Sequence, residues 1–285
     1  ALARLSPHKR RPENMTWLLG VIGDPVSHSL SPVIHKMWIR EHGFDATYEA
    51  LQVKRGELEH ALETLSQREA LGFNITLPHK EDALALADET SDIARRIGAA
   101  NTLVRREQGG WRAENTDAPG FVRSLLDAGI EVAGSRVTLL GAGGSARAVA
   151  ISLMDLRAEI TIANRTRERA KALVSETGIT AEICSLEEGI SQAATADVVI
   201  NTLSLGHSGK SLELPEATGQ YFYDISYGKP AAAIRAEALA KNWQPMDGLG
   251  MLVAQAAYSF EHWFGVLPDT KEALAHCRKL VEATT

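Results

Sequence analysis

Residues 136–146 of the chain read RVTLLGAGGSA, and this stretch decides the fold. Its first five residues are almost wholly apolar, which is typical of a strand buried on both faces of a parallel sheet. A glycine-rich turn follows and leads into a helical run over residues 149–156. A strand, a glycine-rich turn and a helix in this order predict a dinucleotide-binding βαβ unit. The alternative is an ordinary tight turn between a strand and a helix.

Each position of this turn has a role in the prediction. Gly141 suits the tight turn, and Gly143 leaves room for the backbone to approach a pyrophosphate. Ala146 is small enough to let the helix and the strand pack closely. Around Gly144 and Ser145, the free backbone N–H groups of the first helical turn should face the phosphates.

The composition is that of an ordinary globular protein. Of the 285 residues, 45% are hydrophobic and 23% are charged, and this length can form two domains with substantial cores. The net charge of −6 argues against nucleic acid as the main partner. No apolar run approaches the ~18 residues that span a bilayer, so we expect no membrane partner. The expected assembly is a monomer or a homodimer.

The cysteines and histidines indicate no metal site. Cys184 and Cys277 lack the spacing of a metal or redox motif, so we expect two core thiols in a reducing compartment, the cytoplasm. The nine histidines include no HExxH or comparable ligand pair. Residues 1–15 lack the apolar segment of a secretory signal, and we expect them to be a disordered leader.

Several hydroxyl groups lie just before the first predicted helix. A strand over residues 17–22 ends at a Gly-Asp-Pro turn, and we expect a helix from Pro32 to about Glu41. Ser31 before Pro32 is a good N-cap, which needs no ligand. Capping does not explain Ser29. Because hydroxyl donors and a helix N-terminus both favour an anion, the two serines are candidates for a carboxylate site.

Lys80 stands where a lysine is unfavourable. A predicted strand over residues 71–76 is followed by a helix with Pro78 at its first position, so Lys80 falls in the first turn. A lysine there opposes the helix dipole. Such an exception to a local rule indicates a function, and a lysine can donate and accept a proton. The alternative is a solvated lysine that tolerates the cost.

Asp117 follows a predicted hairpin with strands over residues 101–106 and 111–114. It precedes a helix that we expect to end at Ala128 and to be closed by Gly129. Its carboxylate suits either a helix cap or the acceptance of hydrogen bonds from a polyol. The spacing leaves both roles open.

The end of the next predicted strand, residues 160–163, indicates which dinucleotide is bound. An NAD-preferring fold places an acidic residue there for the ribose 2′-OH, whereas residues 164–169 read NRTRER. On a new helical turn, Arg165 and Arg169 are four residues apart and can face one point, which suits the 2′-phosphate of NADP. The alternative is a solvated basic face with Glu168 as partner.

Taken together, the motifs resemble those of shikimate dehydrogenases, from about Trp17 to Leu280. They are GDP at 23–25, HSLSP at 28–32, NITLPHK at 74–80, ANTL at 100–103, NTD at 115–117, GAGG at 141–144, NRT at 164–166 and DGLGMLVAQ at 247–255. The resemblance implies an α/β fold with an N-terminal substrate domain, a C-terminal Rossmann-type domain and an active site in the cleft between them. It implies that residues 16–116 plus 248–285 form the substrate-binding domain and residues 117–247 the NADP-binding domain.

The resemblance also implies the roles of individual residues. Lys80 and Asp117 would form the catalytic pair at the reacting hydroxyl, with Lys80 handling the proton. The substrate-binding residues would be Ser29, Ser31, Thr76, Asn101, Tyr227 and Gln255. The cofactor-binding residues would be Gly141, Gly143, Gly144, Ser145, Ala146, Asn164, Arg165, Thr166, Arg169, Asn201, Ile225, Gly248 and Met251.

The implied activity is the reversible, NADPH-dependent reduction of 3-dehydroshikimate to shikimate, a step in chorismate and aromatic amino acid biosynthesis, with no metal. Leu203 stands where relatives usually have a hydroxyl residue, and Ile225 where they often have methionine or leucine. These departures leave open a quinate/shikimate dehydrogenase or a paralogue acting on a related cyclic hydroxy acid.

Two further classes share the architecture. A non-catalytic ligand-sensing protein with the same fold would be expected to have lost Lys80 or Asp117, and both are present. A folate-linked dehydrogenase would not need the carboxylate site at Ser29 and Ser31.

Overall fold

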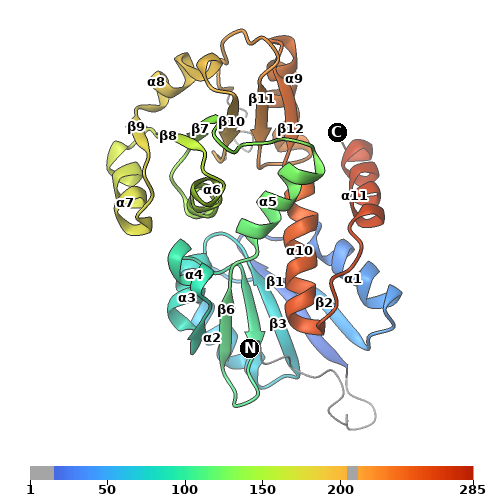
Figure 1. The fold of residues 1–285 in the computed structure, drawn as a ribbon. Helices are drawn as coiled ribbons and strands as arrows, with labels where there is room; N and C mark the ends of the chain where they lie inside the picture. The colour runs from blue at the N-terminus through green and yellow to red at the C-terminus, as the bar shows by residue number, and fades with distance from the viewer. Residues whose placement is uncertain (1–15, 204–210, 285) are drawn as a thin grey trace. The chain divides into compact units, whose positions relative to one another are not determined.

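The structure is a computed structural model that describes residues 16–203 and 211–284 (Figure 1). The predicted leader, residues 1–15, lies outside the described residues. Contacts divide the chain into two units. The first unit comprises the described residues up to Thr116 and Val253–Ala273, and the second comprises Asp117–Leu252 and the residues from Leu274 onward. Which unit binds substrate and which binds NADP stays a prediction.

The first unit is built on a six-stranded sheet of order β2-β1-β3-β5-β6-β4. Its strands are β1 (Trp17–Gly23), β2 (Ala46–Gln52), β3 (Ala70–Ile75), β4 (Glu89–Thr90), β5 (Thr102–Arg105) and β6 (Trp111–Glu114). Its first helices are α1 (Ser31–Glu41), α2 (Leu58–Ser66), α3 (Lys80–Leu86) and α4 (Asp92–Ile97). Strand β1 pairs in parallel with β2 and β3, and β5 pairs antiparallel with both β3 and β6.

The second unit contains a parallel six-stranded sheet of order β12-β11-β10-β7-β8-β9. Its strands are β7 (Arg136–Leu140), β8 (Glu159–Ala163), β9 (Glu182–Cys184), β10 (Val198–Asn201), β11 (Tyr221–Asp224) and β12 (Gln244–Asp247). Its helices include α5 (Asp117–Asp127), α6 (Gly144–Asp155), α7 (Arg167–Thr177), α8 (Leu186–Ser191), the 3-10 helix η1 (Ala193–Thr195) and α9 (Lys229–Ala240). The residues of α10 (Leu249–Phe264) and α11 (Lys271–Thr284) are divided between the two units.

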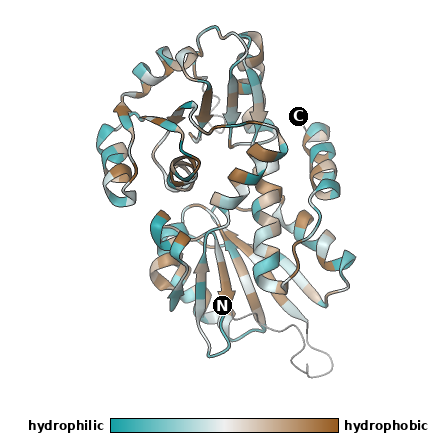
Figure 2. Ribbon diagram, in the orientation of Figure 1, coloured by the Kyte–Doolittle hydropathy of each residue, from teal (hydrophilic) through white to brown (hydrophobic). Residues whose placement is uncertain are grey.

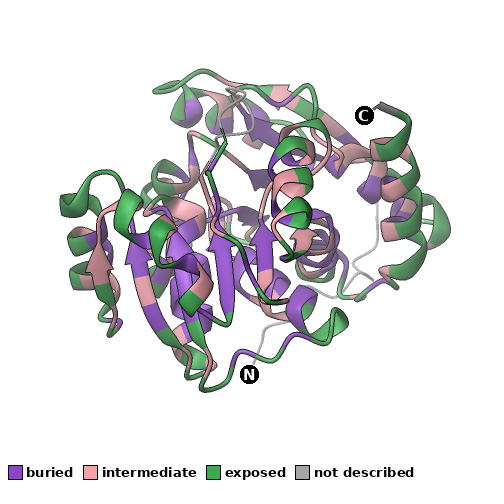
Figure 3. Ribbon diagram, turned by 90° about the horizontal axis from the view of Figure 1, so that it is seen from above, coloured by how far each residue is buried: buried purple, intermediate pink, exposed green. Residues whose placement is uncertain are grey.

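The strands form the cores of both units. Figure 2 shows many of the hydrophobic residues on strands, and Figure 3 shows buried strands beside helices that carry many of the exposed residues. In the second unit β10 is buried along its whole length, and β7 is buried except at Arg136. This burial explains their nearly continuous apolar sequence, because a parallel sheet is covered on both faces.

The predicted α/β fold and the strand over residues 136–140 are confirmed. The predicted hairpin is also present, as β5 and β6. The helix after the glycine turn begins earlier than its apolar run suggested, at Gly144, because small residues extend it by more than one turn. The short edge strands β4 and β9 were missed, since two or three residues are too few to show a periodic pattern.

The thiols and the helices bear on two further predictions. Cys184 and Cys277 are both free. Cys277 is buried, as predicted, whereas Cys184 is only half-buried, so the prediction of a core thiol is wrong there. In the part of the chain that the structure describes, no helix is both long and apolar enough to cross a membrane. The same residues include no cluster of three or more His, Cys, Asp or Glu suited to a metal.

Candidate functional site

The two predicted carboxylate-binding serines lie at the start of α1. The prediction that Ser31 caps this helix is wrong, because Leu30 occupies the N-cap position in a near-helical conformation and no side chain caps the helix. Ser31 is instead the first helical residue and is buried. The hydroxyl of Ser29 accepts a hydrogen bond from the Ser31 backbone N–H at 3.2 Å. Capping therefore does not occupy the Ser31 side chain.

Lys80 lies in the first turn of α3, as predicted. It is the first residue of this helix and not the third, as a helix beginning at Pro78 would require. Pro78 precedes the helix after a cis Leu77-Pro78 peptide bond, and His79 is the N-cap residue. The predicted helical position of Pro78 is therefore wrong. The side chain of His79 is held outside the helix by a 2.7 Å hydrogen bond between its Nε2 and the Val53 carbonyl. Acidic residues follow Lys80 in the same turn and offset its unfavourable interaction with the dipole.

Backbone hydrogen bonds bring three of the predicted residues to one end of the first sheet. Thr76 follows β3, and its N–H donates to the Ile22 carbonyl of β1 at 2.9 Å. Asn101 precedes β5, which pairs with β3, and its carbonyl accepts from the Ile75 N–H at 2.7 Å. The carbonyl of Lys80 accepts from the Ala100 N–H at 2.8 Å. The three positions are therefore neighbours in the backbone.

Asn101 and Gln255 form a buried pair of side-chain amides. The Asn101 Nδ2 donates to the Gln255 Oε1 at 3.1 Å, and both residues are at least nine-tenths buried. The Asn101 Oδ1 accepts from the Thr116 backbone N–H at 2.7 Å. Since only the oxygen of the amide can accept, this bond fixes which way the Asn101 side chain points.

The glycine turn of the second unit has two kinds of glycine. Gly141 has a φ of +114°, and a Cβ added there would lie 2.3 Å from the Thr202 Oγ1, so the fold itself requires glycine. A Cβ added at Gly143 or Gly144 would meet nothing within 4 Å. The turn is therefore open above the start of α6.

The start of α6 has the properties of an anion-binding site. No side chain caps the helix at its N-cap residue, Gly143, which leaves the first backbone N–H groups to bind a ligand. Ser145 is half-buried in the first turn, and Ala146 is fully buried against the unit's interior. The glycine turn thus offers a pyrophosphate space and backbone N–H donors that no side chain of the described residues caps.

The predicted geometry of the two arginines after β8 is wrong in one respect. Helix α7 begins at Arg167 with Thr166 as its N-cap residue, so Arg165 lies before the helix and does not share a helical face with Arg169. A 2.8 Å hydrogen bond from the Asn164 Nδ2 to the Thr166 carbonyl holds the turn between strand and helix.

The exposed arginines differ in their ion pairs. Arg167 pairs with Glu188 at 2.5 Å. Within residues 16–203 and 211–284, the structure shows no ion pair for Arg165, Arg169 or the suggested partner Glu168. Two exposed guanidinium groups beside the strand tip are therefore left for an anionic ligand.

Asp224, which the sequence analysis missed, lies beside Asn201 at the ends of β11 and β10. Its Oδ1 accepts from the Asn201 Nδ2 at 3.3 Å and from the Ser226 backbone N–H at 2.9 Å. Its Oδ2 is buried and has no hydrogen-bond partner among the described residues. Burial therefore raises the pKa of the Asp224 carboxyl. The only sign in the sequence was an acid at the end of an apolar strand.

Asp247 holds the turn that carries the predicted contacts Gly248 and Met251. Its buried carboxylate pairs with Arg278, through two hydrogen bonds, and with Arg235 at 3.3 Å. Its Oδ1 also accepts from the Leu249 N–H at 3.2 Å at the start of α10. A Cβ added at Gly248 would lie 1.9 Å from the Ile225 carbonyl oxygen, so the two backbones are in contact.

Asp117 and Tyr227 complete the predicted residues. Asp117 is the first residue of α5 and is buried, with 7% of its surface exposed. Tyr227 is half-buried in the loop between β11 and α9. Their roles stay predictions.

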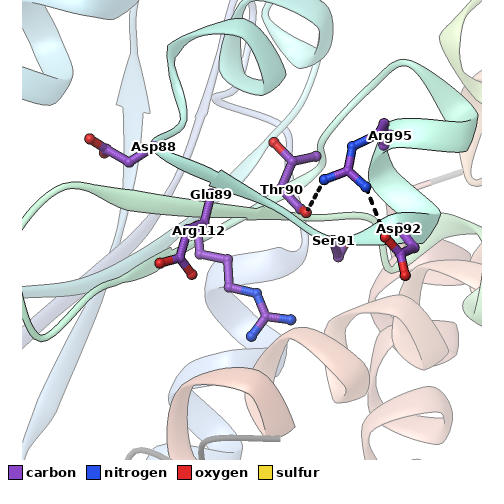
Figure 4. A pocket seen from close by; sticks show the side chains of 7 residues that line it. All are labelled: Asp88, Glu89, Thr90, Ser91, Asp92, Arg95 and Arg112. Atoms are coloured by element: carbon purple, nitrogen blue, oxygen red, sulfur yellow. Dashed lines mark hydrogen bonds and ion pairs between the residues drawn. The ribbon is translucent and has the colours of Figure 1, made fainter.

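A pocket of about 550 Å³ lies elsewhere in the first unit (Figure 4). Arg95 bridges Asp92 at 2.8 Å and the Thr90 carbonyl at 3.0 Å. None of the predicted site residues lines the pocket, which is polar and solvent-exposed. Its lining residues are Asp88, Glu89, Thr90, Ser91, Asp92, Arg95 and Arg112.

Three family models match successive parts of the chain. Residues 21–103 match the shikimate dehydrogenase substrate binding domain. Residues 124–209 match shikimate / quinate 5-dehydrogenase, and residues 248–277 match the shikimate 5'-dehydrogenase C-terminal domain.

Similar proteins cover nearly the whole chain. A shikimate dehydrogenase (NADP(+)) of Hyphomonas neptunium is 58% identical over 95% of this chain and 100% of its own length. The structure of shikimate 5-dehydrogenase from Thermus thermophilus, in complex with NADP(H) and shikimate, has a TM-score of 0.83 at 36% identity and covers 93% of this chain and 99% of its own. The structure of shikimate dehydrogenase from Aquifex aeolicus has a TM-score of 0.81 at 34% identity, covering 91% and 97%.

Proposed function

Because the chain belongs to the shikimate dehydrogenase family, we propose that it catalyses the reversible, NADPH-dependent reduction of 3-dehydroshikimate to shikimate. The observation that carries this proposal is its match over nearly its whole length to NADP-linked enzymes of that activity. The reaction belongs to chorismate and aromatic amino acid biosynthesis.

The glycine turn and the strand tip of the second unit fit NADP. Gly143 and Gly144 leave the space, and the uncapped start of α6 leaves the N–H donors, that a pyrophosphate needs. Arg165 and Arg169 would be charged partners for the 2′-phosphate. The tip of β8 has no acidic residue to accept hydrogen bonds from the ribose 2′-OH of NAD. When bound, NADP supplies or accepts the hydride.

We assign the remaining cofactor contacts to groups that the second unit holds in place. Asn201 is oriented by Asp224, and Gly248 touches the backbone of Ile225. Met251 lies three residues after Gly248, in the first turn of α10. These residues would contact the nicotinamide end of the dinucleotide.

The substrate-binding residues belong mostly to the first unit. Ser29 and Ser31 would hydrogen-bond the carboxylate, with Tyr227 near it, whereas Thr76, Asn101 and Gln255 would hold the ring hydroxyls. Since Asn101 and Gln255 are buried, an analogue that lacks a hydroxyl would lose hydrogen bonds to these amides that bulk water could not replace. Such a site discriminates strongly between related acids.

Lys80 and Asp117 would act at the reacting hydroxyl. In the oxidation direction the carbinol carbon loses a hydride, and the O–H proton passes to the amine of Lys80. In the reduction direction the Lys80 ammonium returns this proton to the carbonyl oxygen as the hydride arrives. The carboxylate of Asp117 would accept a hydrogen bond and hold the reacting group beside the amine.

The location and assembly of the protein are part of the proposal. The free thiols of Cys184 and Cys277 favour a reducing compartment, and we place the enzyme in the cytoplasm. It would function as a monomer or a homodimer, with the substrate bound mainly by residues 16–116 and 248–285 and NADP by residues 117–247.

A substrate-by-cofactor matrix tests the function. Initial rates are measured for shikimate and for quinate, each with NADP and with NAD. We expect shikimate with NADP to give the highest kcat/KM. A higher value for quinate with NAD would overturn the proposal in favour of a quinate/shikimate dehydrogenase, and no turnover of either acid would favour a ligand-sensing protein.

A further inference from the structure

A continuous set of buried hydrogen bonds runs through the first unit to two predicted substrate residues. It starts at Tyr48. The Tyr48 hydroxyl donates to the Asn74 Oδ1 at 2.7 Å, and the Asn74 Nδ2 donates to the Ser259 hydroxyl at 2.9 Å. Tyr48 and Ser259 are fully buried.

Ser259 joins this path to the amide pair described above. Its hydroxyl lies 3.0 Å from the Thr116 hydroxyl and 2.8 Å from that of Thr102. The Thr116 hydroxyl lies 2.9 Å from the Asn101 Nδ2 and 3.4 Å from the Gln255 Oε1. The path therefore connects Tyr48 with the two amides that are predicted to bind ring hydroxyls.

The directions of these bonds are constrained because each hydroxyl has one proton. The Ser259 hydroxyl donates to the Gln255 carbonyl, one helical turn earlier, at 3.0 Å. Its two lone pairs then accept from Asn74 and from one threonine. Ser259 is thus a junction that touches the backbone of Gln255 and the partners of Asn101 at the same time.

The Tyr48 end is constrained in the same way. The tyrosine donates its single proton to the Asn74 Oδ1, and since only the oxygen of an amide can accept, this bond directs the Asn74 Nδ2 toward Ser259. Tyr48 therefore fixes the orientation of Asn74. Burial raises the pKa of Tyr48, which keeps the phenol protonated and able to donate.

We propose that Tyr48 and Ser259 are positioning residues for substrate binding, which orient Asn101 and Gln255 through the side chains of Asn74 and Thr116. The inference rests on the proposed function. A buried polar path stabilises the fold only if all its members are satisfied, and its connection to the predicted substrate residues Asn101 and Gln255 favours a role in binding.

The test removes one hydroxyl at a time. Ser259→Ala and Tyr48→Phe each delete the hydroxyl group that takes part in the path and keep the rest of the side chain. We expect KM for shikimate to rise about five- to tenfold in each variant, while kcat falls less than about threefold and KM for NADP stays within about twofold. Calorimetric titration of shikimate should show the same loss of affinity.

The double variant and an analogue sharpen the test. If the two residues act through one path, the rise in KM of the double variant is smaller than the product of the single effects. Ser259→Ala should also discriminate less between shikimate and an analogue that lacks a ring hydroxyl, because the amide pair is less fixed.

Matched control variants come from the second unit. Ser152→Ala removes a buried hydroxyl that donates to a carbonyl one turn earlier, at 2.9 Å, as Ser259 does. Tyr223→Phe removes a buried phenol hydroxyl bonded to Ser124 at 2.8 Å. Both should lower Tm by an amount similar to their counterparts without changing KM for shikimate.

The outcomes separate the inference from the proposed function. If the wild type turns over normally and KM for shikimate is unchanged in Ser259→Ala and Tyr48→Phe, the inference alone is overturned. The same holds if KM rises equally in the control variants. Wild-type protein that neither turns over nor binds shikimate would overturn the proposed function and this inference with it.

Discussion

Replacing Gly143 by alanine separates a glycine needed by a ligand from one needed by the fold. Gly143 has φ −95° and ψ −172°, which alanine adopts without strain, and the new Cβ would meet nothing within 4 Å. Alanine is a poorer N-cap residue by about 0.5–1 kcal/mol, but it lowers the entropy of the unfolded chain by about 0.4–1 kcal/mol. The two effects nearly cancel, so we expect the free energy of unfolding to change by less than about 0.5 kcal/mol.

The same methyl group should impair cofactor binding. It projects into the space above the uncapped start of α6, where we propose that the pyrophosphate of NADP approaches the backbone. We expect KM for NADP to rise at least about tenfold, which corresponds to about 1.4 kcal/mol of binding energy. At saturating NADP, kcat should change little, because no group at the reacting carbon is altered.

Gly141→Ala is the matched control. Its φ of +114° and the Thr202 Oγ1 at 2.3 Å from the new Cβ make alanine strained there, with or without cofactor. Urea unfolding should show a loss of at least about 1 kcal/mol for this variant and almost none for Gly143→Ala. A folded Gly143→Ala enzyme with wild-type KM for NADP would refute the assignment of this turn to the pyrophosphate.

Three further perturbations test other parts of the account. Lys80→Ala should lower kcat by orders of magnitude with little change in KM for shikimate, as measured by steady-state kinetics; unchanged turnover would exclude Lys80 as the proton-transfer group. Burial raises the pKa of Asp224 above the unfolded value of 3.8, so its contribution to stability is full below that pH and is lost as the pH rises through the folded pKa. Urea unfolding at about pH 3.5 and about pH 7 should therefore show Asp224→Asn gaining stability relative to wild type at the higher pH, and a constant difference would contradict this. Arg278→Leu should cost about 2 kcal/mol in thermal unfolding, because it removes two bonds to the buried Asp247 but leaves Arg235 as a partner; a loss below about 0.5 kcal/mol would show that the pair contributes little.

Much of the second sheet was predictable because local patterns determine it. The apolar run at 136–140 and the glycines after it have one common structural outcome, and the strand formed with the predicted bounds. In the first sheet, the hairpin of β5 and β6 was also predictable from a local pattern, since a Gly-Gly pair separates its two strands.

Helix starts were harder to predict, because tertiary contacts compete with local preference. Ser31 and Pro32 form a good capping sequence, yet the turn before them already places Leu30 in a near-helical conformation. Pro78 suits a first helical position, but a hydrogen bond from His79 to the Val53 carbonyl delays the helix. Val53 lies far from His79 in the sequence, so a local pattern could not indicate this contact.

The supporting residues of the candidate site were not predictable from spacing. Tyr48, Asn74 and Ser259 come from three elements that are far apart in the chain, and only the fold makes them neighbours. Asp224 gave no pattern beyond an acid at the end of a strand, and the motif that begins at Asp247 did not indicate its ion pairs with Arg235 and Arg278. Motifs identified the residues expected to touch ligands, whereas the structure identified the side chains that hydrogen-bond to those residues.

Isotope transfer is the most direct test of the central claim that a hydride passes between NADPH and the carbon of a cyclic hydroxy acid. The enzyme is incubated with 3-dehydroshikimate and NADPH carrying deuterium at the transferable C4 position of the nicotinamide, and the product is analysed by mass spectrometry. We predict shikimate with one deuterium on the new carbinol carbon. Formation of shikimate without deuterium, or no shikimate at all, would contradict the account.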